Sequence, residues 1–339
     1  MDIEALVRKG RNKERCEDRC LNGRSVLCDI DGRCSIDGAF IAAVADGVGG
    51  NQLGDVAAGY VLQQLAAADV AALADAATVK SFIQARNEEL ISLARGIAGA
   101  RNMATTLTGI VINDNGGWIF HAGNTRIYAI NGAHIHRLTR DHTTYAWLMD
   151  AGRVEDARMC NRSEITCCLG NGNPAQLAQL EVMPLNDFTA LLMTSDGIHE
   201  TLADEQIESV LNRAQSPEEA CRLLCDTAQM LGSRDDLTAM LVYCWGKAQP
   251  ACADNCIVIF STNFRRSSGQ SIADGRSFYY EETAHADCDD YALRDADRLL
   301  CVGNAAQYSA GNAKRRRTAA CVQNRKAEGK QSHAEGIRR

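Results

Sequence analysis

The sequence predicts an α+β fold with mainly antiparallel sheets, because strand-like runs follow one another while helical stretches gather in separate blocks. Runs rich in β-branched residues end in Gly, Asn or Asp, which is typical of strands joined by hairpins. Most of these runs succeed each other without a crossover helix, so a parallel sheet is not expected. The runs lie at 39–46, 106–113, 117–123, 126–132, 188–196 and 237–245.

Four stretches have the composition and apolar spacing of helices. The first two, at 55–73 and 78–96, are rich in Ala, Leu, Gln and Glu, with apolar residues at helical spacing. A third helix is expected at 204–212. A fourth begins with Ser216 as its cap, has Pro followed by two acids in its first turn, and continues to about Leu231.

The patterning divides the 339 residues into a domain at 1–246 and a tail at 247–339. Apolar residues make up 46% and charged residues 23% of the chain, as in ordinary globular proteins. After residue 246 the periodicity fades and Ser, Asn, Asp, Arg and Gly dominate, with one weak strand at 256–260. We therefore expect a poorly ordered, basic-ended tail.

The charge distribution argues against a nucleic-acid-binding protein. The net charge is −7, yet residues 247–339 hold 15 basic and 11 acidic residues, so the preceding domain is strongly acidic. No apolar run reaches the roughly 18 residues of a membrane span. The first residues also lack the apolar segment of a signal peptide. We expect a cytoplasmic protein with neither nucleic-acid nor membrane partners.

The 15 cysteines are expected to be thiols in a reducing compartment. A zinc site remains the alternative, although the chain contains no paired CxxC motifs. Three cysteine pairs have a spacing of four residues, which suits one face of a helix: Cys16/Cys20, Cys221/Cys225 and Cys252/Cys256.

Three acidic positions follow or precede apolar runs in a way that suits metal binding. Asp46 ends the run AFIAAVAD and precedes a glycine-rich turn, and Asp196 repeats this device in LLMTSDGIHE. Asp235 stands just before the last apolar run. Carboxylates beside exposed main-chain carbonyls offer hard oxygen ligands to hard divalent cations. Each Asp-Gly pair alone also fits an ordinary hairpin turn, so the prediction depends on their combination.

The order and spacing of these motifs resemble the PPM (PP2C-like) family of metal-dependent protein serine/threonine phosphatases. VADGVGG resembles VADGMGG, TSDGIHETLADEQI resembles SDGLTDxLSDEEI, and SRDDLT resembles SxDNIT. Between them, ATTLTGIVI resembles GTTLVxxxI, and GNTRIYAINGAHIHRLTRDHT resembles GDSRxYLxRDGxLxxLTxDHS. Residues 148–171 are similar to the family's flap segment, and the matches extend from about residue 10 to about residue 245.

The resemblance implies a four-layer αββα fold, in which an antiparallel β-sandwich is flanked by α-helices. It also implies hydrolysis of phosphoserine and phosphothreonine in proteins with two Mg²⁺ or Mn²⁺ ions. Asp46 matches the carboxylate that bridges both metals, and Gly47 matches the carbonyl ligand. Asp196 and Asp235 match the carboxylates that complete one metal's shell, while Asp236 stands where the family has Asn.

The N-terminal motif reads KERCED where the family has roughly RxxNED. Glu17 and Asp18 match the acidic pair that orients the water around the metals. Lys13 stands where an Arg grips the phosphate, and a lysine attracts phosphate only as a point charge. Cys16 replaces the Asn of this motif. A phosphate contact from Lys13 and an ordinary solvated surface are both compatible with the sequence.

A second departure is GNTR in place of GDSR, so Asn124 replaces an aspartate that serves an additional, looser metal in relatives. A neutral amide is a much weaker ligand for Mg²⁺ or Mn²⁺. The implied mechanism is a single-step attack of water, without a phospho-enzyme. His142 is a candidate proton donor, and a satisfied turn histidine is the competing interpretation.

The expected partner is a phosphoprotein substrate that a serine/threonine kinase modifies, and a monomer is expected. The competing hypothesis is a catalytically weak PPM-fold scaffold that binds phosphoproteins, which Lys13, Cys16 and Asn124 motivate. A zinc or redox protein is the third alternative. Hydrolysis of p-nitrophenyl phosphate with Mn²⁺ and with EDTA separates these hypotheses, because only an active phosphatase turns it over in a metal-dependent way.

Overall fold

A computed structural model describes residues 1–48 and 53–243, and these contain two six-stranded sheets and one two-stranded sheet. All strand pairs named in them are antiparallel. The first sheet has the order β12 (Glu181–Pro184), β8 (Gly116–Ala122), β7 (Leu107–Asn113), β5 (Phe40–Asp46), β2 (Asp18–Leu21) and β3 (Val26–Leu27). The second has the order β10 (His134–Arg137), β9 (Arg126–Asn131), β13 (Ala190–Thr194), β14 (Leu237–Tyr243), β1 (Asp2–Arg8) and β4 (Asp31–Ser35). The pair is β11 (Leu169–Gly170) and β6 (Ala104–Thr105).

The two large sheets pack face to face around an apolar interior. In β1, Ile3, Ala5 and Val7 are buried in this interior, as the two-residue period of a strand requires. The first sheet contributes side chains such as Ile110 and Ile119 to the same cluster. This is the β-sandwich that the family resemblance implies.

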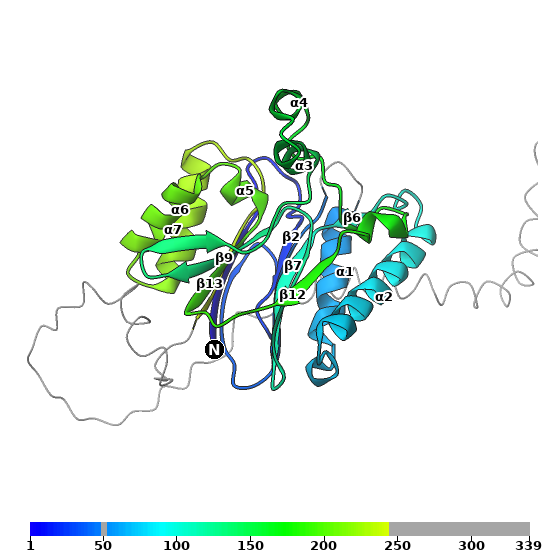
Figure 1. Cartoon of the computed structure of the whole chain (residues 1–339), viewed down its shortest axis with the longest axis horizontal. Helices are drawn as coiled ribbons and strands as arrows, with labels where there is room; N and C mark the ends of the chain where they lie inside the picture. The colour runs from blue at the N-terminus through cyan, green and yellow to red at the C-terminus, as the bar shows by residue number, and fades with distance from the viewer. Residues whose placement is uncertain (49–52, 244–339) are drawn as a thin grey trace, which may run out of the picture. The chain divides into compact units, whose positions relative to one another are not determined.

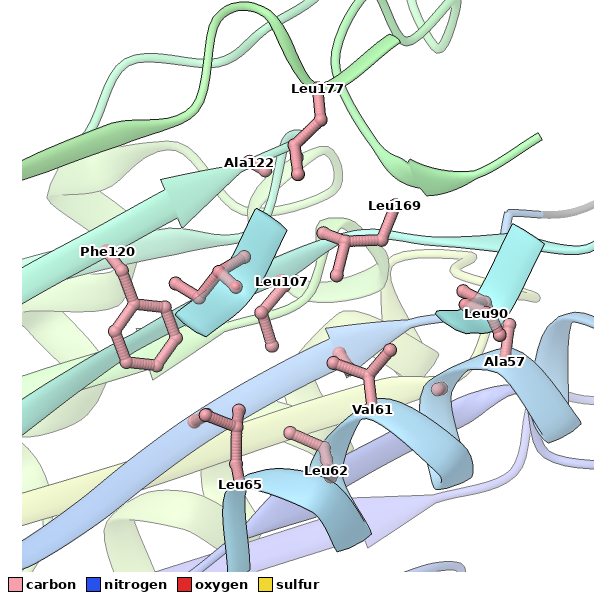
Figure 2. Packing of buried hydrophobic residues seen from close by; sticks show 14 of the residues in the cluster. Ala57, Val61, Leu62, Leu65, Leu90, Leu107, Phe120, Ala122, Leu169 and Leu177 are labelled. Atoms are coloured by element: carbon pink, nitrogen blue, oxygen red, sulfur yellow. The ribbon is translucent and has the colours of Figure 1, made fainter. Parts of the chain in front are cut away.

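Helices cover the outer face of each sheet, which makes four layers (Figure 1). On the first sheet lie α1 (Gly54–Ala66) and α2 (Ala76–Arg95), and Figure 2 shows Val61, Leu62 and Leu65 of α1 facing Leu107 and Phe120. On the second sheet lie α5 (Asp196–His199), α6 (Asp204–Arg213) and α7 (Pro217–Met230). The predicted αββα architecture is therefore confirmed.

Two further helices lie in a segment that overlaps the stretch similar to the family's flap. From here on we call residues 144–166 the flap. These are α3 (Thr144–Asp150) and α4 (Val154–Met159), and Figure 1 shows them beyond the ends of the sheets. The hydroxyl of Thr143 caps α3 by accepting a hydrogen bond from the backbone N–H of Ala146 at 3.1 Å. Trp147 and Met159 are 55% and 87% exposed, so the flap buries little of its own apolar surface.

The predicted elements are present with several corrections. The helix expected at 55–73 ends at Ala66, and a separate 3-10 turn at Val70–Ala72 follows Asp69, whose side chain caps it. The run at 188–196 is a strand only to Thr194, and Asp196 begins α5. The cap on α7 is confirmed, since the Ser216 hydroxyl accepts from the backbone N–H of Glu219 at 3.1 Å.

The helical interpretation of the cysteine spacing is right for one pair and wrong for another. Cys221 and Cys225 lie on the buried face of α7, whereas Cys20 lies in β2 and Cys16 in the segment before it. Cys252 and Cys256, the expected strand at 256–260 and the domain boundary after residue 246 lie outside the described residues. In the described ranges, no helix is both long and apolar enough to span a membrane.

Candidate active site

A cavity of about 150 Å³ collects five of the residues that the sequence singles out. Asp46 is the last residue of β5, Asp196 follows β13, and Asp235 precedes β14, so neighbouring strand ends deliver the three carboxylates. Lys13 comes from the segment between β1 and β2. The cavity is lined by Lys13, Asp46, Gly47, Val48, Ser163, Ile165, Asp196 and Asp235.

The backbone around Asp46 is held on both sides, which leaves its carboxylate free for the cavity. Its N–H donates to the Thr106 hydroxyl at 2.9 Å, and its carbonyl accepts from the Thr105 hydroxyl at 3.0 Å. A Cβ on Gly47 would lie 2.4 Å from the carbonyl carbon of Gly54. Only glycine therefore allows the chain to turn here toward α1.

Hydrogen bonds between hydroxyl side chains and the backbone position the segment that carries Asp196. The Ser195 hydroxyl accepts from the backbone N–H of Thr238 at 2.9 Å, and the Ser233 hydroxyl donates to the carbonyl of Gly197 at 2.8 Å. A Cβ on Gly197 would lie 2.0 Å from the carbonyl oxygen of Asp236. These contacts join the segments that carry Asp196 and Asp235.

Asn124 belongs to the site rather than to a turn alone. Its Nδ2 donates to Oδ2 of Asp196 at 2.8 Å, and the residue is 2% exposed. This hydrogen bond joins the segment before β9 to the carboxylate of Asp196. Oδ1 of Asn124 is buried and has no hydrogen-bond partner among the described residues.

The carboxylates of the site repel one another in a poorly solvated space. Burial raises the pKa of Asp46, and the charges of Asp18, Asp196 and Asp235 raise it further. Burial and the charge of Asp235 raise the pKa of Asp196. Asp18 lies directly opposite Asp46 in the β2–β5 pairing, and burial raises its pKa to about 7. Such an arrangement is stable with ionised carboxylates only when cations balance it.

Lys13 supplies one such cation. Its ammonium contacts Oδ1 of Asp235, and it lies 3.1 Å from Oδ2 of Asp236 and 3.4 Å from Oε2 of Glu17. Burial alone would lower the pKa of Lys13, but hydrogen bonds and charges from Asp235 and Asp236 outweigh burial and raise it. The lysine therefore stays charged among the carboxylates.

Sequence reasoning missed the structural role of Asp236. This residue is 1% exposed, and its carboxylate also accepts the backbone N–H groups of Gly10 and Glu17, each at 2.7 Å. It thereby fixes the N-terminal segment against the start of β14. One feature of the sequence could have revealed this role: SRDDLT has a second acid at the position where the family has Asn.

Glu17 and Asp18 lie behind the cavity wall rather than on it. Oε2 of Glu17 faces Lys13, and Oδ2 of Asp18 accepts from the Thr238 hydroxyl at 2.7 Å. His142 is not among the lining residues. Its ring stacks on His121 with 4.6 Å between centroids, and its Nδ1 accepts from the N–H of Gly123 at 3.2 Å. These contacts favour the satisfied turn histidine.

The donor set fits hydrated divalent cations. Oδ1 of Asp18 and Oδ1 of Asn124 are buried acceptors without a partner among the described residues, and both are oxygens suited to ordering water. In the described ranges, no three His, Cys, Asp or Glu side chains form a ready-made metal cage. Ions at Asp46, Asp196 and Asp235 would therefore complete their shells with water and the Gly47 carbonyl. None of the cysteines in the described ranges forms a disulfide.

Comparison with known proteins identifies relatives of this chain. The family model for protein phosphatase 2C matches residues 9–242. A serine/threonine phosphatase stp of Listeria welshimeri is 27% identical over 215 residues, which cover 61% of this chain and 85% of that protein. The serine/threonine protein phosphatase PstP of Mycobacterium tuberculosis is 28% identical over 229 residues, which cover 64% of this chain and 43% of that protein.

Solved structures show the same fold. The crystal structure of the M. tuberculosis phosphatase PstP/Ppp superposes with a TM-score of 0.59 at 24% identity, covering 71% of this chain and 98% of that one. The structure of the phosphatase Stp1 from Staphylococcus aureus gives a TM-score of 0.59 at 22% identity, covering 72% and 95%. Since the family model spans most of the residues that carry the sandwich, its helices and the acidic cavity, the chain belongs to the protein phosphatase 2C family.

Proposed function

We propose that the protein hydrolyses phosphoserine and phosphothreonine in proteins, with water activated by two Mg²⁺ or Mn²⁺ ions and without a phospho-enzyme. The observation that carries this proposal is the meeting of Asp46, Asp196 and Asp235 with Gly47 in one cavity of a protein phosphatase 2C fold. The names of the relatives as serine/threonine phosphatases support the same substrate class.

Each residue has a distinct role in the proposal. Asp46 would hold both ions, the Gly47 carbonyl would be a further ligand, and Asp196 and Asp235 would complete the shell of one ion. The ions, when bound, lower the pKa of the attacking water and neutralise charge on the phosphoryl oxygens. Glu17 and Asp18 orient water around this centre from behind the cavity wall.

Lys13 faces the cavity, and we propose that its ammonium attracts the phosphoryl group. Its present partners are the carboxylates of Asp235, Asp236 and Glu17. Divalent cations bound at Asp235 would weaken the electrostatic attraction between its carboxylate and the Lys13 ammonium. The ammonium would then be available to an incoming anion. The ammonium acts as a point charge and cannot form the bidentate hydrogen bonds that an arginine makes with a phosphate.

The partners follow from the reaction. The substrate is a phosphoprotein, and a serine/threonine kinase supplies it. We further propose that the chain acts as a monomer in the cytoplasm. The lack of disulfides among the cysteines of the described residues supports the reducing compartment.

Two observations favour the competing function of a catalytically weak phosphoprotein-binding scaffold. Lys13 is held by three carboxylates, and Asn124 replaces an acid beside Asp196. Such a protein binds a phosphopeptide without metal-dependent turnover.

The test is the initial rate on a phosphothreonine peptide with Mn²⁺, with Mg²⁺ and with EDTA. We expect turnover with either metal, none with EDTA, and recovery when metal is returned in excess. Binding of the peptide without turnover under any of these conditions rejects the phosphatase proposal in favour of the scaffold.

A further inference from the structure

A second, larger cavity of about 480 Å³ lies between the β9–β10 hairpin and α3 of the flap. Its lining is rich in arginine, although the domain around it is acidic. Three acids also line it, Asp141, Asp150 and Glu200, so the ionised groups leave one positive charge in excess. The arginines are Arg126, Arg137, Arg140 and Arg162.

Two of the arginines form ion pairs with Asp141 within the protein. Arg126 makes a bidentate ion pair with Asp141, with N–O distances of 2.9 and 2.6 Å. This geometry locks its guanidinium in place. Arg137 lies 3.9 Å from the same carboxylate and is the weaker partner.

The other two retain donors for a ligand. Arg140 pairs with Asp150, but both side chains are more than half exposed, and such pairs exchange readily. Arg162 lies over the ring of Tyr145 with its guanidinium carbon 4.4 Å from the centroid, and it donates to the tyrosine hydroxyl at 3.0 Å. No carboxylate in the described ranges lies within ion-pair distance of Arg162. Stacking pre-orients its remaining N–H groups.

This cavity adjoins the acidic one. Asn124 lines the arginine cavity and donates to Asp196 of the acidic cavity. On the flap, Ser163 lines the acidic cavity, and the residue before it, Arg162, lines the arginine cavity. The Ser163 hydroxyl also donates to Oε1 of Glu200 at 3.4 Å. One extended peptide that presents its phosphorylated residue to the acidic cavity therefore passes beside the arginines.

We propose that the arginine cavity is a substrate subsite for an anionic side chain close to the phosphorylated residue. It takes a carboxylate or a second phosphate, because a guanidinium presents paired donors to the paired oxygens of either group. The inference rests on the proposed phosphatase function and adds a preference for acidic or doubly phosphorylated segments.

The test compares three phosphothreonine peptides of equal length on the metal-loaded protein. One has neutral flanks, one has Asp flanks, and one carries a non-hydrolysable phosphonate analogue of phosphoserine. We expect kcat/KM for the anionic peptides to exceed that for the neutral peptide by about fivefold, as suits one partly exposed charged contact. A gain with Asp identifies the carboxylate, and a gain confined to the phosphonate identifies the phosphate.

Two variants tie this preference to the cavity. Arg162→Met should bring the ratio of anionic to neutral kcat/KM to within about twofold of unity, and Arg162→Glu should favour a Lys-flanked peptide instead. The matched control is Arg158→Met, since Arg158 also belongs to the flap but pairs with Glu155 at 2.7 Å and lines neither cavity. It should keep the wild-type ratio.

Equal kcat/KM for all three peptides in the wild type overturns the subsite while the phosphatase proposal stands. A preference that Arg162→Met leaves intact overturns it equally. Absence of turnover on every peptide with Mn²⁺ or Mg²⁺ overturns the phosphatase proposal and the subsite together.

Discussion

The carboxylate of Asp236 lies 3.1 Å from the ammonium of Lys13, although 223 positions separate the two residues in the chain. The same carboxylate accepts the backbone N–H groups of Gly10 and Glu17. One buried acid therefore fixes the segment that brings Lys13, Glu17 and Asp18 to the end of the sandwich. This chain has an acid and a lysine where the family's motifs have Asn and Arg, and the two replacements contact each other.

Removing this acid should loosen the N-terminal segment. Asp236→Ala leaves the backbone N–H groups of Gly10 and Glu17 without their acceptor and removes one of the three carboxylates around the Lys13 ammonium. We therefore expect a loss of about 2–4 kcal/mol in the free energy of unfolding. Asp236→Asn keeps one acceptor oxygen and should cost about half as much. Urea denaturation at neutral pH measures both variants.

The control for this series is Asp226→Ala, which breaks the partly exposed ion pair with Arg8. A surface pair of this kind contributes about 1 kcal/mol or less. If Asp236→Ala costs no more than this control, Asp236 does not anchor the segment.

Asp46→Asn should separate the metal role of the site from its effect on folding. The variant removes a charge from the repelling cluster, so its melting temperature in EDTA should be above that of the wild type. It should also lose the stabilisation that Mn²⁺ gives the wild type, and its metal-dependent activity should fall by about 100-fold or more. Thermal unfolding with and without Mn²⁺, together with peptide hydrolysis, tests this.

Asp114→Asn is the matched control, because Asp114 is exposed in the turn between β7 and β8. It should leave activity and the Mn²⁺-induced shift unchanged. An Asp46→Asn protein that retains activity within a few-fold of the wild type contradicts the assignment of Asp46.

The sequence predicted the strands whose β-branched residues form continuous runs, such as β5, β7 and β14. It did not reveal β1, because the strand DIEALVR contains Glu, Ala, Leu and Arg, which are common in helices. The pairing of β1 with β14 and β4 decides its conformation, and such long-range pairing leaves no local signal. The short edge strand β3 has only two residues, too few for a period.

The site was predictable to a similar extent. The positions of Asp46, Asp196 and Asp235 follow from short motifs around strand ends, since each motif carries its own turn chemistry. The contact of Asp236 with Lys13 and the hydrogen bond from Asn124 to Asp196 depend on tertiary packing. The arginine cavity combines residues of β9, β10 and the flap, which no single motif contains.

Glu4 provides a test of stability against pH away from the site. It lies on the helix-facing side of β1, opposite Arg33 of β4, and is 5% exposed. Burial raises its pKa from 4.5 to about 7, against the opposing charge of Arg33. A raised folded-state pKa means that stability falls as pH rises from about 4.5 to about 7, and the loss persists at higher pH.

Glu4→Gln should therefore stabilise the protein at pH 8 by about 1–3 kcal/mol and have little effect at about pH 4.5. Urea denaturation at the two pH values measures the difference. Glu205→Gln, in the exposed first turn of α6, serves as the control and should show no such pH dependence of its effect beyond a few tenths of a kcal/mol. A Glu4→Gln effect that is the same at both pH values contradicts the burial argument.

Asn124→Asp should make activity depend on a further, weakly held cation. The substitution replaces the amide that donates to Asp196 with a second carboxylate, so it removes a hydrogen bond and adds repulsion. At low Mn²⁺ the variant should be slower than the wild type. At millimolar Mn²⁺ an additional ion balances the new charge, and we expect a second rise in rate that the wild type lacks. Asn131→Asp, at the exposed end of β9, is the matched control and should follow the wild-type Mn²⁺ curve. Superimposable titrations of Asn124→Asp and wild type would mean that the contact with Asp196 has no influence on metal binding.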